Sequence, residues 1–410
     1  MLALTLLRDP SYRGYWLALF LSQMGTWMQA ASQGWLVIEL TGKAERLGLV
    51  VALQFLPALF VTLAAGVWAD RYPRRNLLLF TQGGMALLAF LLFLLIQFGW
   101  VRYPYLLVFA LLYGTANAID LPVRQAFTVE LAGRARYPGA IALNSFGFNV
   151  SRLVGPALAG LLIAGVGIGY SYLANALSFL PMLWALSRTV PGNSERTPGN
   201  VWHEALEGIR YVMNERVVRG VVLLVGLVSV FGMNFQTLVP SYARLVLNLD
   251  AKEYGFLLSA VGLGSLLAAL AQAFSTSIRP HRTLWGAVFL GLGLAGLGMF
   301  PKLALLLLSL AGLGMVTVLV NANTTVQMSS PDRLRGRVMS VYSLVLLGVS
   351  PLGSYLTGLL IDHLGGERAP LILAMLTLVS VFAVWLWAWP KRGPETTSPC
   401  GLSEASPPTR

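Results

Sequence analysis

The sequence predicts an all-α membrane protein in which twelve transmembrane helices form two pseudo-symmetric six-helix bundles. Three observations point to this fold class: the composition, the number of long apolar segments, and short motifs that recur about 200 residues apart. Of the 410 residues, 56% are hydrophobic and only 11% are charged, whereas soluble domains carry about 25% charged residues. A chain with so few charges is expected to place most of its length in lipid.

About twelve apolar segments follow one another, and each is long enough to cross a bilayer. The first six are expected at 12–39, 47–69, 77–98, 103–130, 139–166 and 168–187. A polar stretch follows, and the other six are expected at 220–247, 254–274, 283–300, 303–328, 338–361 and 369–389. The predicted units are an N-terminal bundle (1–188), a cytoplasmic linker (189–219), a C-terminal bundle (220–390) and a disordered tail (391–410) rich in Pro, Ser and Thr.

The linker contains a further helical pattern. Trp202, Leu206, Ile209 and Met213 are spaced four, three and four residues apart, which places them on one face of a helix. Charged residues occupy its other faces. The pattern predicts an amphipathic helix that lies on the cytoplasmic surface of the membrane.

The two halves repeat each other in sequence. Gly48 at the start of the second span corresponds to Gly255 at the start of the eighth, and the motif Gly-Leu-Leu-Ile at Gly160 recurs at Gly358. Because both halves contain six spans, they are expected to have the same orientation, with a ligand site between them near the membrane midplane.

The distribution of basic residues predicts the orientation. With the N-terminus inside, the inner segments contain 19 Lys and Arg residues and the outer loops contain 6. Positively charged loops are retained in the cytoplasm, so both termini are expected there.

Several classes of function have little support. The net charge of +12 is spread over short loops, which argues against a nucleic-acid partner. The three histidines are scattered, the single cysteine (Cys400) lies in the tail, and no phosphate-binding Gly-Lys-Ser/Thr loop is present. We therefore expect no metal, no cofactor, no catalytic site and no ATP-driven pump.

Polar residues inside the spans follow helical spacing. One face is formed in the first span by Ser22, Thr26, Gln29 and Gln33, in the fourth by Tyr113, Asn117, Asp120 and Arg124, in the fifth by Ser145, Asn149 and Arg152, and in the tenth by Thr317, Asn321 and Thr324. Such faces either line a water-accessible cavity or hydrogen-bond neighbouring helices. The side chains expected to contact a substrate are Thr26, Trp27, Gln29, Gln33, Asn117, Asn149, Phe231, Phe235 and Asn321.

Asp120 is the only acidic residue well inside a predicted span, about ten residues or ~15 Å from the cytoplasmic end. Arg152 lies at a similar depth in the next span, and Arg124 is four residues away on the same helix, so either arginine can pair with Asp120. If the pair separates during a conformational cycle, Asp120 can take up and release a proton. The alternative is a permanent structural ion pair.

The stretch Gly66–Leu78 joins the second and third spans and combines Asp70 with Arg71, Arg74 and Arg75. Charges this dense cannot lie in hydrocarbon, so the loop belongs at the cytoplasmic face.

These residues resemble the major facilitator superfamily. The pattern Gly66-x-x-x-Asp70-Arg71-x-x-Arg74-Arg75 is similar to its signature loop, and Gly155-Pro156-x-x-Ala159-Gly160 resembles the fifth-span motif of its antiporters. Stretches at 52–59, 122–127, 141–160 and 335–344 resemble the twelve-span drug:proton antiporter branch that includes macrolide efflux proteins and the enterobactin exporter. The fourth-span arginine motif of drug antiporters is not clearly present.

The resemblance implies the major facilitator fold, with two bundles that work by alternating access, and a bacterial inner-membrane location. It gives the loop of Gly66, Asp70, Arg71, Arg74 and Arg75 a gating role, with Glu130 as the partner of Arg74. The expected function is proton-coupled export of amphipathic small molecules by a monomer, and its partners are a substrate, protons and the lipid bilayer. An importer or facilitator of the same fold, a membrane enzyme and a sensor without transport are the alternatives.

Overall fold

A computed structural model describes residues 2–133, 135–189, 201–273 and 281–387. Within these ranges it leaves undescribed the side chains of residues 2–4, 63, 64, 66, 67, 69, 70, 201–205 and 273. The predicted tail at 391–410 and residues 190–200 of the predicted linker lie outside the described residues.

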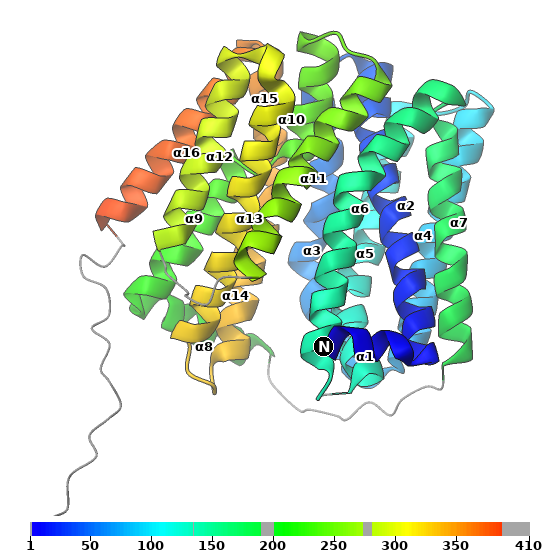
Figure 1. The fold of residues 1–410 in the computed structure, drawn as a ribbon, viewed down its shortest axis with the longest axis vertical. Coiled ribbons are helices and arrows are strands. Elements are labelled where there is room, and N and C mark those ends of the chain that lie inside the picture. The colour runs from blue at the N-terminus through cyan, green and yellow to red at the C-terminus, as the bar shows by residue number, and fades with distance from the viewer. Residues whose placement is uncertain (1, 134, 190–200, 274–280, 388–410) are drawn as a thin grey trace, which may run out of the picture.

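The first half of the chain forms one bundle of long helices (Figure 1). Its helices are α2 (Pro10–Thr41), α3 (Ala44–Arg71), α4 (Arg74–Gln97), α5 (Tyr103–Ala132), α6 (Tyr137–Gly165) and α7 (Gly169–Arg188). A short helix, α1 (Leu2–Arg8), precedes them and packs on α6, with Leu6 fully buried. The bounds of α2 to α7 agree with the six predicted segments to within a few residues.

The second half forms the other bundle. Its elements are α9 (Arg216–Phe231), α10 (Phe235–Ser241), the π-helical turn η1 (Tyr242–Val246), α11 (Ala251–Ala273), α12 (His281–Met299), the 3₁₀ turn η2 (Pro301–Leu303), α13 (Ala304–Ser329), α14 (Arg335–Gly348), α15 (Ser350–Leu364) and α16 (Arg368–Trp387). Two predicted spans are therefore interrupted. The seventh breaks at residues 232–234, and the eleventh divides between α14 and α15, where Pro351 lies in the first turn of the next helix.

Helix α8 (Val201–Asn214) lies at the same end of the molecule as α1 (Figure 1), which we call the α1/α8 end; the other is the far end. One side of α8 packs on α14, where Gly208 faces the backbone of Arg337. Leu206, Ile209 and Met213 of the predicted apolar stripe are exposed. These three residues thus face away from the protein, as expected of a helix that contacts a membrane surface, and the side chain of Trp202 lies outside the described part of the structure.

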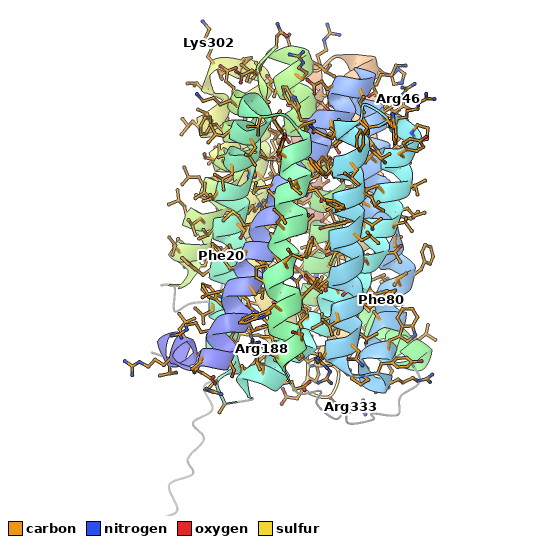
Figure 2. The ribbon with its side chains drawn as sticks, turned by 90° about the vertical axis from the view of Figure 1, so that its right-hand side faces the viewer. Phe20, Arg46, Phe80, Arg188, Lys302 and Arg333 are labelled. Carbon is orange, nitrogen blue, oxygen red and sulfur yellow. The ribbon has the colours of Figure 1, made fainter. Side chains whose placement is uncertain are left out.

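The outer surface of the bundles is suited to lipid. Arg188 and Arg333 lie at one end, Arg46 and Lys302 at the other, and Phe20 and Phe80 lie between them (Figure 2). Phe80 is 77% exposed, which is unfavourable in water and favourable in hydrocarbon. Ten helical stretches of the described residues are long and apolar enough to cross a membrane.

The all-α membrane fold is thus confirmed, whereas the count of twelve spans is not fully established. Helices α2 and α7 are absent from the ten, although both lie within the bundle. The composition of α2 explains its absence, because a row of hydroxyl and amide side chains lowers its hydropathy.

Glycines bring the two halves into backbone contact near the far end. A Cβ on Gly160 of α6 would lie 2.6 Å from the carbonyl oxygen of Ala251, and one on Gly255 of α11 would lie 2.6 Å from that of Pro156. In the repeat-related contact between α3 and α15, a Cβ on Gly48 would lie 2.5 Å from the carbonyl oxygen of Ser354. The glycines that recur in sequence therefore form the two equivalent joints between the halves.

Candidate functional site

The larger of two described cavities is about 630 Å³ in volume and is formed mainly by α2, α5 and α6. Its deep end lies at Gln33 and Gln54, and its lining extends to Thr128 and Tyr137 near the α1/α8 end. This volume is within the range of sites that bind drug-sized molecules. The two halves are in backbone contact near the far end, and the cavity extends from there toward the α1/α8 end.

Three predicted polar faces meet at this cavity. The described lining includes Ser22, Thr26, Gln29 and Gln33 of α2, Tyr113, Asn117, Asp120 and Arg124 of α5, and Ser145 and Asn149 of α6. Residues three and four apart share a helix face, so each helix presents its polar row to the same space. Trp27 and Phe55 add aromatic surface at the deep end.

Many of the polar groups are held in place by hydrogen bonds. Gln33 Nε2 donates to Gln54 Oε1 at 2.8 Å, which joins α2 to α3. Asn175 Nδ2 of α7 donates to Gln29 Oε1 at 2.7 Å. Gln29 is 2% exposed, so it contributes more to the contact with α7 than to the open cavity.

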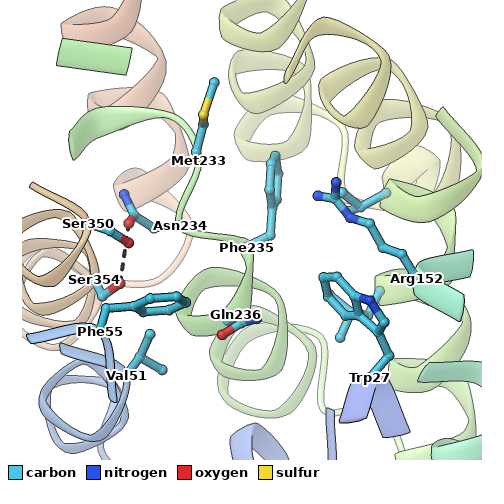
Figure 3. Close-up of a pocket in the computed structure, with 12 residues that line it drawn as sticks. Trp27, Val51, Phe55, Arg152, Met233, Asn234, Phe235, Gln236, Ser350 and Ser354 are labelled. Carbon is cyan, nitrogen blue, oxygen red and sulfur yellow. Dashed lines mark hydrogen bonds between the residues drawn. The ribbon is translucent and has the colours of Figure 1, made fainter. Parts of the chain in front are cut away.

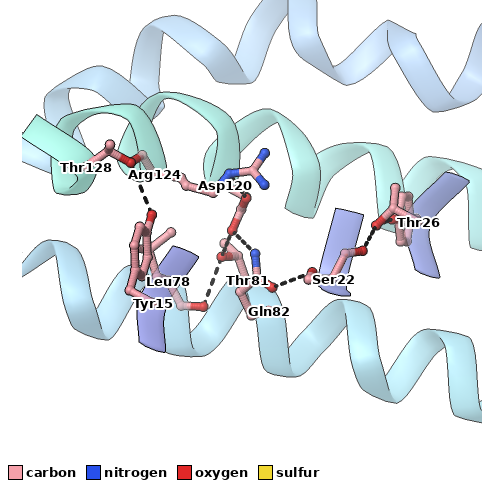
Figure 4. Close-up of polar contacts among 10 residues, drawn as sticks. Tyr15, Ser22, Thr26, Leu78, Thr81, Gln82, Asp120, Arg124 and Thr128 are labelled. Atoms are coloured by element: carbon pink, nitrogen blue, oxygen red, sulfur yellow. Dashed lines mark hydrogen bonds and ion pairs between the residues drawn. The ribbon is translucent and has the colours of Figure 1, made fainter. Parts of the chain in front are cut away.

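Asp120 lies at the centre of a network that joins α4 and α5 (Figure 4). Its Oδ1 accepts hydrogen bonds from Thr81 Oγ1 at 2.9 Å and from Gln82 Nε2 at 2.8 Å, and Arg124 Nε lies 3.2 Å from its Oδ2. Ser22 Oγ of α2 donates to Gln82 Oε1 at 3.4 Å and extends the network. Asp120 is 1% exposed and is the one buried acidic side chain among the described residues.

The structure selects Arg124 as the partner of Asp120, and the possible pairing with Arg152 is not formed. Both arginines were at suitable depth, but depth does not fix the direction of a side chain around the helix. Arg152 of α6 extends toward α13, where Nη2 donates to Met315 Sδ at 3.2 Å, and its guanidinium lies 5.5 Å from the Trp27 ring centroid.

Arg152 lines a second, smaller cavity of about 110 Å³ between the two halves (Figure 3). The N-terminal half contributes Trp27, Val51, Phe55 and Arg152, and the other half contributes Met233, Asn234, Phe235, Gln236, Leu258, Val261, Ser350 and Ser354. Trp27, Phe55 and Gln236 line both cavities, so the two adjoin. Phe235 is placed at this smaller cavity by the break in the seventh span.

Two expected substrate contacts lie elsewhere. Asn321 of α13 donates from Nδ2 to Gln272 Oε1 at 2.8 Å and to its own helix, so its amide joins α13 to α11. Phe231 ends α9 and lines neither of the two cavities in the described part of the chain. The polar face of the tenth span is therefore used for helix packing.

The loop between α3 and α4 lies at the α1/α8 end. The expected ion pair is present, with Arg74 Nη1 3.2 Å from Glu130 Oε2. Arg75 donates from Nε to the Leu186 carbonyl at 2.7 Å and from Nη2 to the Ser187 carbonyl at 2.9 Å. Arg71 is exposed, and the side chain of Asp70 and the surroundings of Gly66 lie outside the described part of the structure.

A carboxylate from the second half caps a helix of the first half at the far end. Asp362, in the last turn of α15, accepts hydrogen bonds from the backbone nitrogens of Ala44 and Glu45 at 2.9 and 2.8 Å. These two residues begin α3, whose own N-cap residue, Lys43, offers no side-chain cap. Tyr355 Oη donates to Glu45 Oε1 at 3.0 Å beside them.

Four polar residues of the site were not predicted, because the prediction rests on rows of several polar residues at helical spacing. These residues are Gln54, Thr81, Gln82 and Gln236. Each of these glutamines is one of few polar groups in an apolar helix, and the cost of burying an amide in lipid is itself a signal. Among the described residues, no three His, Cys, Asp or Glu side chains lie close enough together to hold a metal ion.

The chain matches a protein family described as transmembrane secretion effectors over residues 2–402. Three curated relatives are similar along most of their length. The staphyloferrin A transporter of Staphylococcus aureus is 24% identical over 370 residues, which cover 88% of this chain and 91% of that protein. The multidrug efflux pump Tap of Mycobacterium tuberculosis is 29% identical over 385 residues, with 87% and 90% covered. The enterobactin exporter EntS of Escherichia coli is 28% identical over 369 residues, with 87% of each covered.

Solved structures agree at the level of the fold. The D-xylose–proton symporter superposes with a TM-score of 0.71 over 92% of this chain and 98% of that protein, at 14% sequence identity. The fold and the family match together settle the assignment: the chain belongs to the transmembrane secretion effector family of the major facilitator superfamily.

Proposed function

We propose that the protein is a secondary active transporter that exports amphipathic small molecules in exchange for protons. The observation that carries the proposal is the cavity of about 630 Å³, whose wall combines amide and hydroxyl groups with a single buried carboxylate. The names of the relatives, a multidrug efflux pump and an enterobactin exporter, support export as the direction.

The cavity favours molecules that are mostly apolar and carry a few hydrogen-bonding groups. Gln23, Gln125, Asn117 and Asn144 offer both donors and acceptors without a net charge. Aromatic side chains such as Trp27 and Phe148 supply flat apolar surface. Such a lining can accept a range of molecules, because amides adapt to either hydrogen-bonding partner.

The membrane topology is part of the proposal. The bias of basic residues supports a cytoplasmic α1/α8 end, twelve spans in a bacterial inner membrane, and both termini inside. We further propose that residues 1–188 and 220–390 act as two units, joined by the linker at 189–219 and followed by the tail at 391–410, in a monomer.

With this orientation, the structure corresponds to an inward-facing state. The cavity extends toward the cytoplasm, and the outer end is closed by the glycine contacts and by Asp362 on α3. Opening outward requires that these contacts separate while the cytoplasmic ends approach. We assign the loop of Asp70, Arg71, Arg74 and Arg75 to stabilising that second state, with Glu130 holding Arg74 in position.

Asp120 is the proposed proton carrier. As a carboxylate it accepts three contacts, from Thr81, Gln82 and Arg124. A shift of α4 relative to α5 removes the hydrogen bonds from Thr81 and Gln82. If the Arg124 side chain then turns away on its own helix, protonation is favoured, since an isolated charge is costly in a membrane interior. Each proton that enters supplies about 2.3 kcal/mol per 100 mV of membrane potential, plus the contribution of the pH gradient.

The test compares accumulation of the dye ethidium in cells with and without the gene at two external pH values. Export driven by protons predicts less dye in the cells that carry the gene, with a larger difference at the lower external pH. Counterflow in proteoliposomes then fixes the direction. Greater accumulation of dye in the gene-carrying cells indicates the importer alternative. A difference in accumulation that is the same at both external pH values contradicts proton coupling.

A further inference from the structure

Among the residues that the structure describes, the guanidinium of Arg152, at the junction of the two halves, has no anionic partner. In the described part of the chain its partners are the Met315 thioether sulfur and the face of Trp27. A thioether is a weak acceptor, and the guanidinium has five N–H donors. Most of its hydrogen-bonding capacity, and all of its charge, are therefore left for a group that the described residues do not supply.

The arginine of the large cavity provides a contrast. Arg124 lies 3.2 Å from Asp120, so its charge is compensated within the same helix. Arg152 lies about 15 residues, or ~22 Å, along α6 from its α1/α8 end, which is close to the middle of a membrane. An uncompensated charge at that depth is unfavourable unless a ligand compensates it.

The small cavity beside Arg152 has the size and lining for an acidic group. Its volume of about 110 Å³ accommodates a carboxylate with its adjoining carbons, because a water molecule occupies about 30 Å³ in the liquid. The Gln236 amide can donate to a second carboxylate oxygen, and Trp27 and Phe235 flank the space with aromatic surface (Figure 3). Since Trp27 and Gln236 also line the large cavity, a molecule can fill both.

We propose that Arg152 binds a carboxylate of the transported molecule, so that the preferred substrates are aromatic or otherwise flat carboxylic acids. The acidic group occupies the small cavity, where the planar guanidinium can form two parallel hydrogen bonds to it. The apolar body extends into the large cavity. This inference rests on the proposed function, to which it adds the substrate class.

The test is a binding comparison on the purified full-length protein with a matched pair of probes, 1-naphthoate and its uncharged amide 1-naphthamide. Isothermal titration of the wild type is expected to show at least tenfold tighter binding of the naphthoate. Arg152→Gln is expected to bind the two probes equally, and Arg152→Lys to keep a reduced preference, because a lysine retains charge without the planar fork. Equal binding by the wild type, or an unchanged preference in Arg152→Gln, overturns the proposal.

A control separates charge recognition from general damage. Arg188→Gln removes another arginine stacked on a tryptophan, with its guanidinium 4.3 Å from the Trp184 ring centroid, but Arg188 lines neither cavity. This variant is expected to keep the naphthoate preference. Loss of the preference in Arg188→Gln as well as in Arg152→Gln would show that general damage to the protein, not loss of an anion site, is measured, and would overturn the assignment.

Ethidium efflux distinguishes failure of this inference from failure of the proposed function. Ethidium is a cation without a carboxylate, so its efflux by the wild type tests export without using the proposed anion site. A wild type that prefers naphthoate but moves no ethidium and no naphthoate refutes export and leaves the anion site standing. Efflux of ethidium by a wild type that shows no preference for naphthoate supports export and overturns the anion site.

Discussion

The two halves of the protein share a fold but differ in what they bury. The large cavity is lined almost entirely by the first half, and the described residues of the second half contribute Gln236 and Leu347. The charged groups at the cavities, Asp120, Arg124 and Arg152, also belong to the first half. The two halves therefore share a helix arrangement but differ in the polar and charged groups that they place at the cavities.

The second half uses its polar residues for packing. Ser241, Ser265, Thr317 and Ser380 each donate to the carbonyl four residues earlier in their own helix. The donors of these hydroxyls are satisfied within their own helix, so they do not need partners in a cavity. The largest apolar core of the molecule lies mostly in this half. The difference suggests a rigid second half against which a polar, rearrangeable first half moves.

The largest effect is expected where the first half carries its buried charge. Asp120→Asn removes the group that takes up a proton, so transport driven by a pH gradient in proteoliposomes is expected to be abolished, while the amide still accepts from Thr81 and the fold is retained. The control is Asp250→Asn at the start of α11, where asparagine caps a helix as well as aspartate. Unchanged coupling in Asp120→Asn would show that the pair with Arg124 is structural.

The next effect tests the rigidity of the second half. A Cβ on Gly264 of α11 would collide with the carbonyl oxygen of Ser309 on α13, so Gly264→Ala is expected to cost about 1–3 kcal/mol of stability. The apparent melting temperature in detergent should fall, whereas ethidium efflux per folded molecule should change little. Gly84→Ala is the control, because a Cβ there meets nothing within 4 Å. Equal melting temperatures for the two variants contradict the close packing of α11 and α13.

The same contact in the first half sharpens the comparison. A Cβ on Gly114 of α5 would collide with the backbone of Gln54, whose side chain lies in the cavity. Gly114→Ala is therefore expected to lower both stability and transport. If Gly264→Ala impairs transport as strongly as Gly114→Ala, the two halves do not differ in function.

Much of the fold could be predicted because lipid imposes a simple rule on the sequence. Each span must satisfy its own backbone, so about 20 apolar residues in a row become a helix. The rule does not reveal where a span breaks. Residues 232–234 and the start of α15 at Ser350 interrupt predicted spans, and the local signals, Gly232 and Pro351, are also common in continuous membrane helices.

The site was harder to predict, because spacing gives a shared face but not the neighbour which that face meets. Gln33 and Asn321 both stand in regular polar rows, yet one faces the cavity and the other faces α11. Arg152 had the right depth to pair with Asp120 and the wrong direction around its helix. The Asp362 cap joins residues more than 300 positions apart, which no local pattern indicates.

A smaller effect is expected where the second half reaches across to the first. Asp362→Ala removes the cap on α3, a contact worth about 1 kcal/mol. Because the contact joins the halves only when the far end is closed, its loss should raise the outward-facing population about fivefold. Spin labels at Asn76→Cys and Met328→Cys, in a Cys400→Ser background, report the separation of the α1/α8 ends, and the shorter distance should become more populated.

Asp9→Ala is the matched control for this shift. Asp9 also caps a helix, with the Ser11 nitrogen 3.1 Å from its Oδ1, but both residues lie in the first half. Removal of a cap within one half should leave the distance distribution unchanged. A similar shift in Asp9→Ala and Asp362→Ala would mean that helix stability, not contact between the halves, controls the equilibrium.

The smallest effect compares one amide from each half. Gln33 donates to Gln54 in the cavity, and Asn321 donates to Gln272 within the second half, each at 2.8 Å. Gln33→Ala should slow the initial rate of ethidium efflux by about fivefold, the equivalent of one hydrogen bond of about 1 kcal/mol. Asn321→Ala should lose a similar amount of stability but less than twofold in rate. Equal losses of rate would place both amides on the transport path, and the second half would then share the chemistry that the structure assigns to the first.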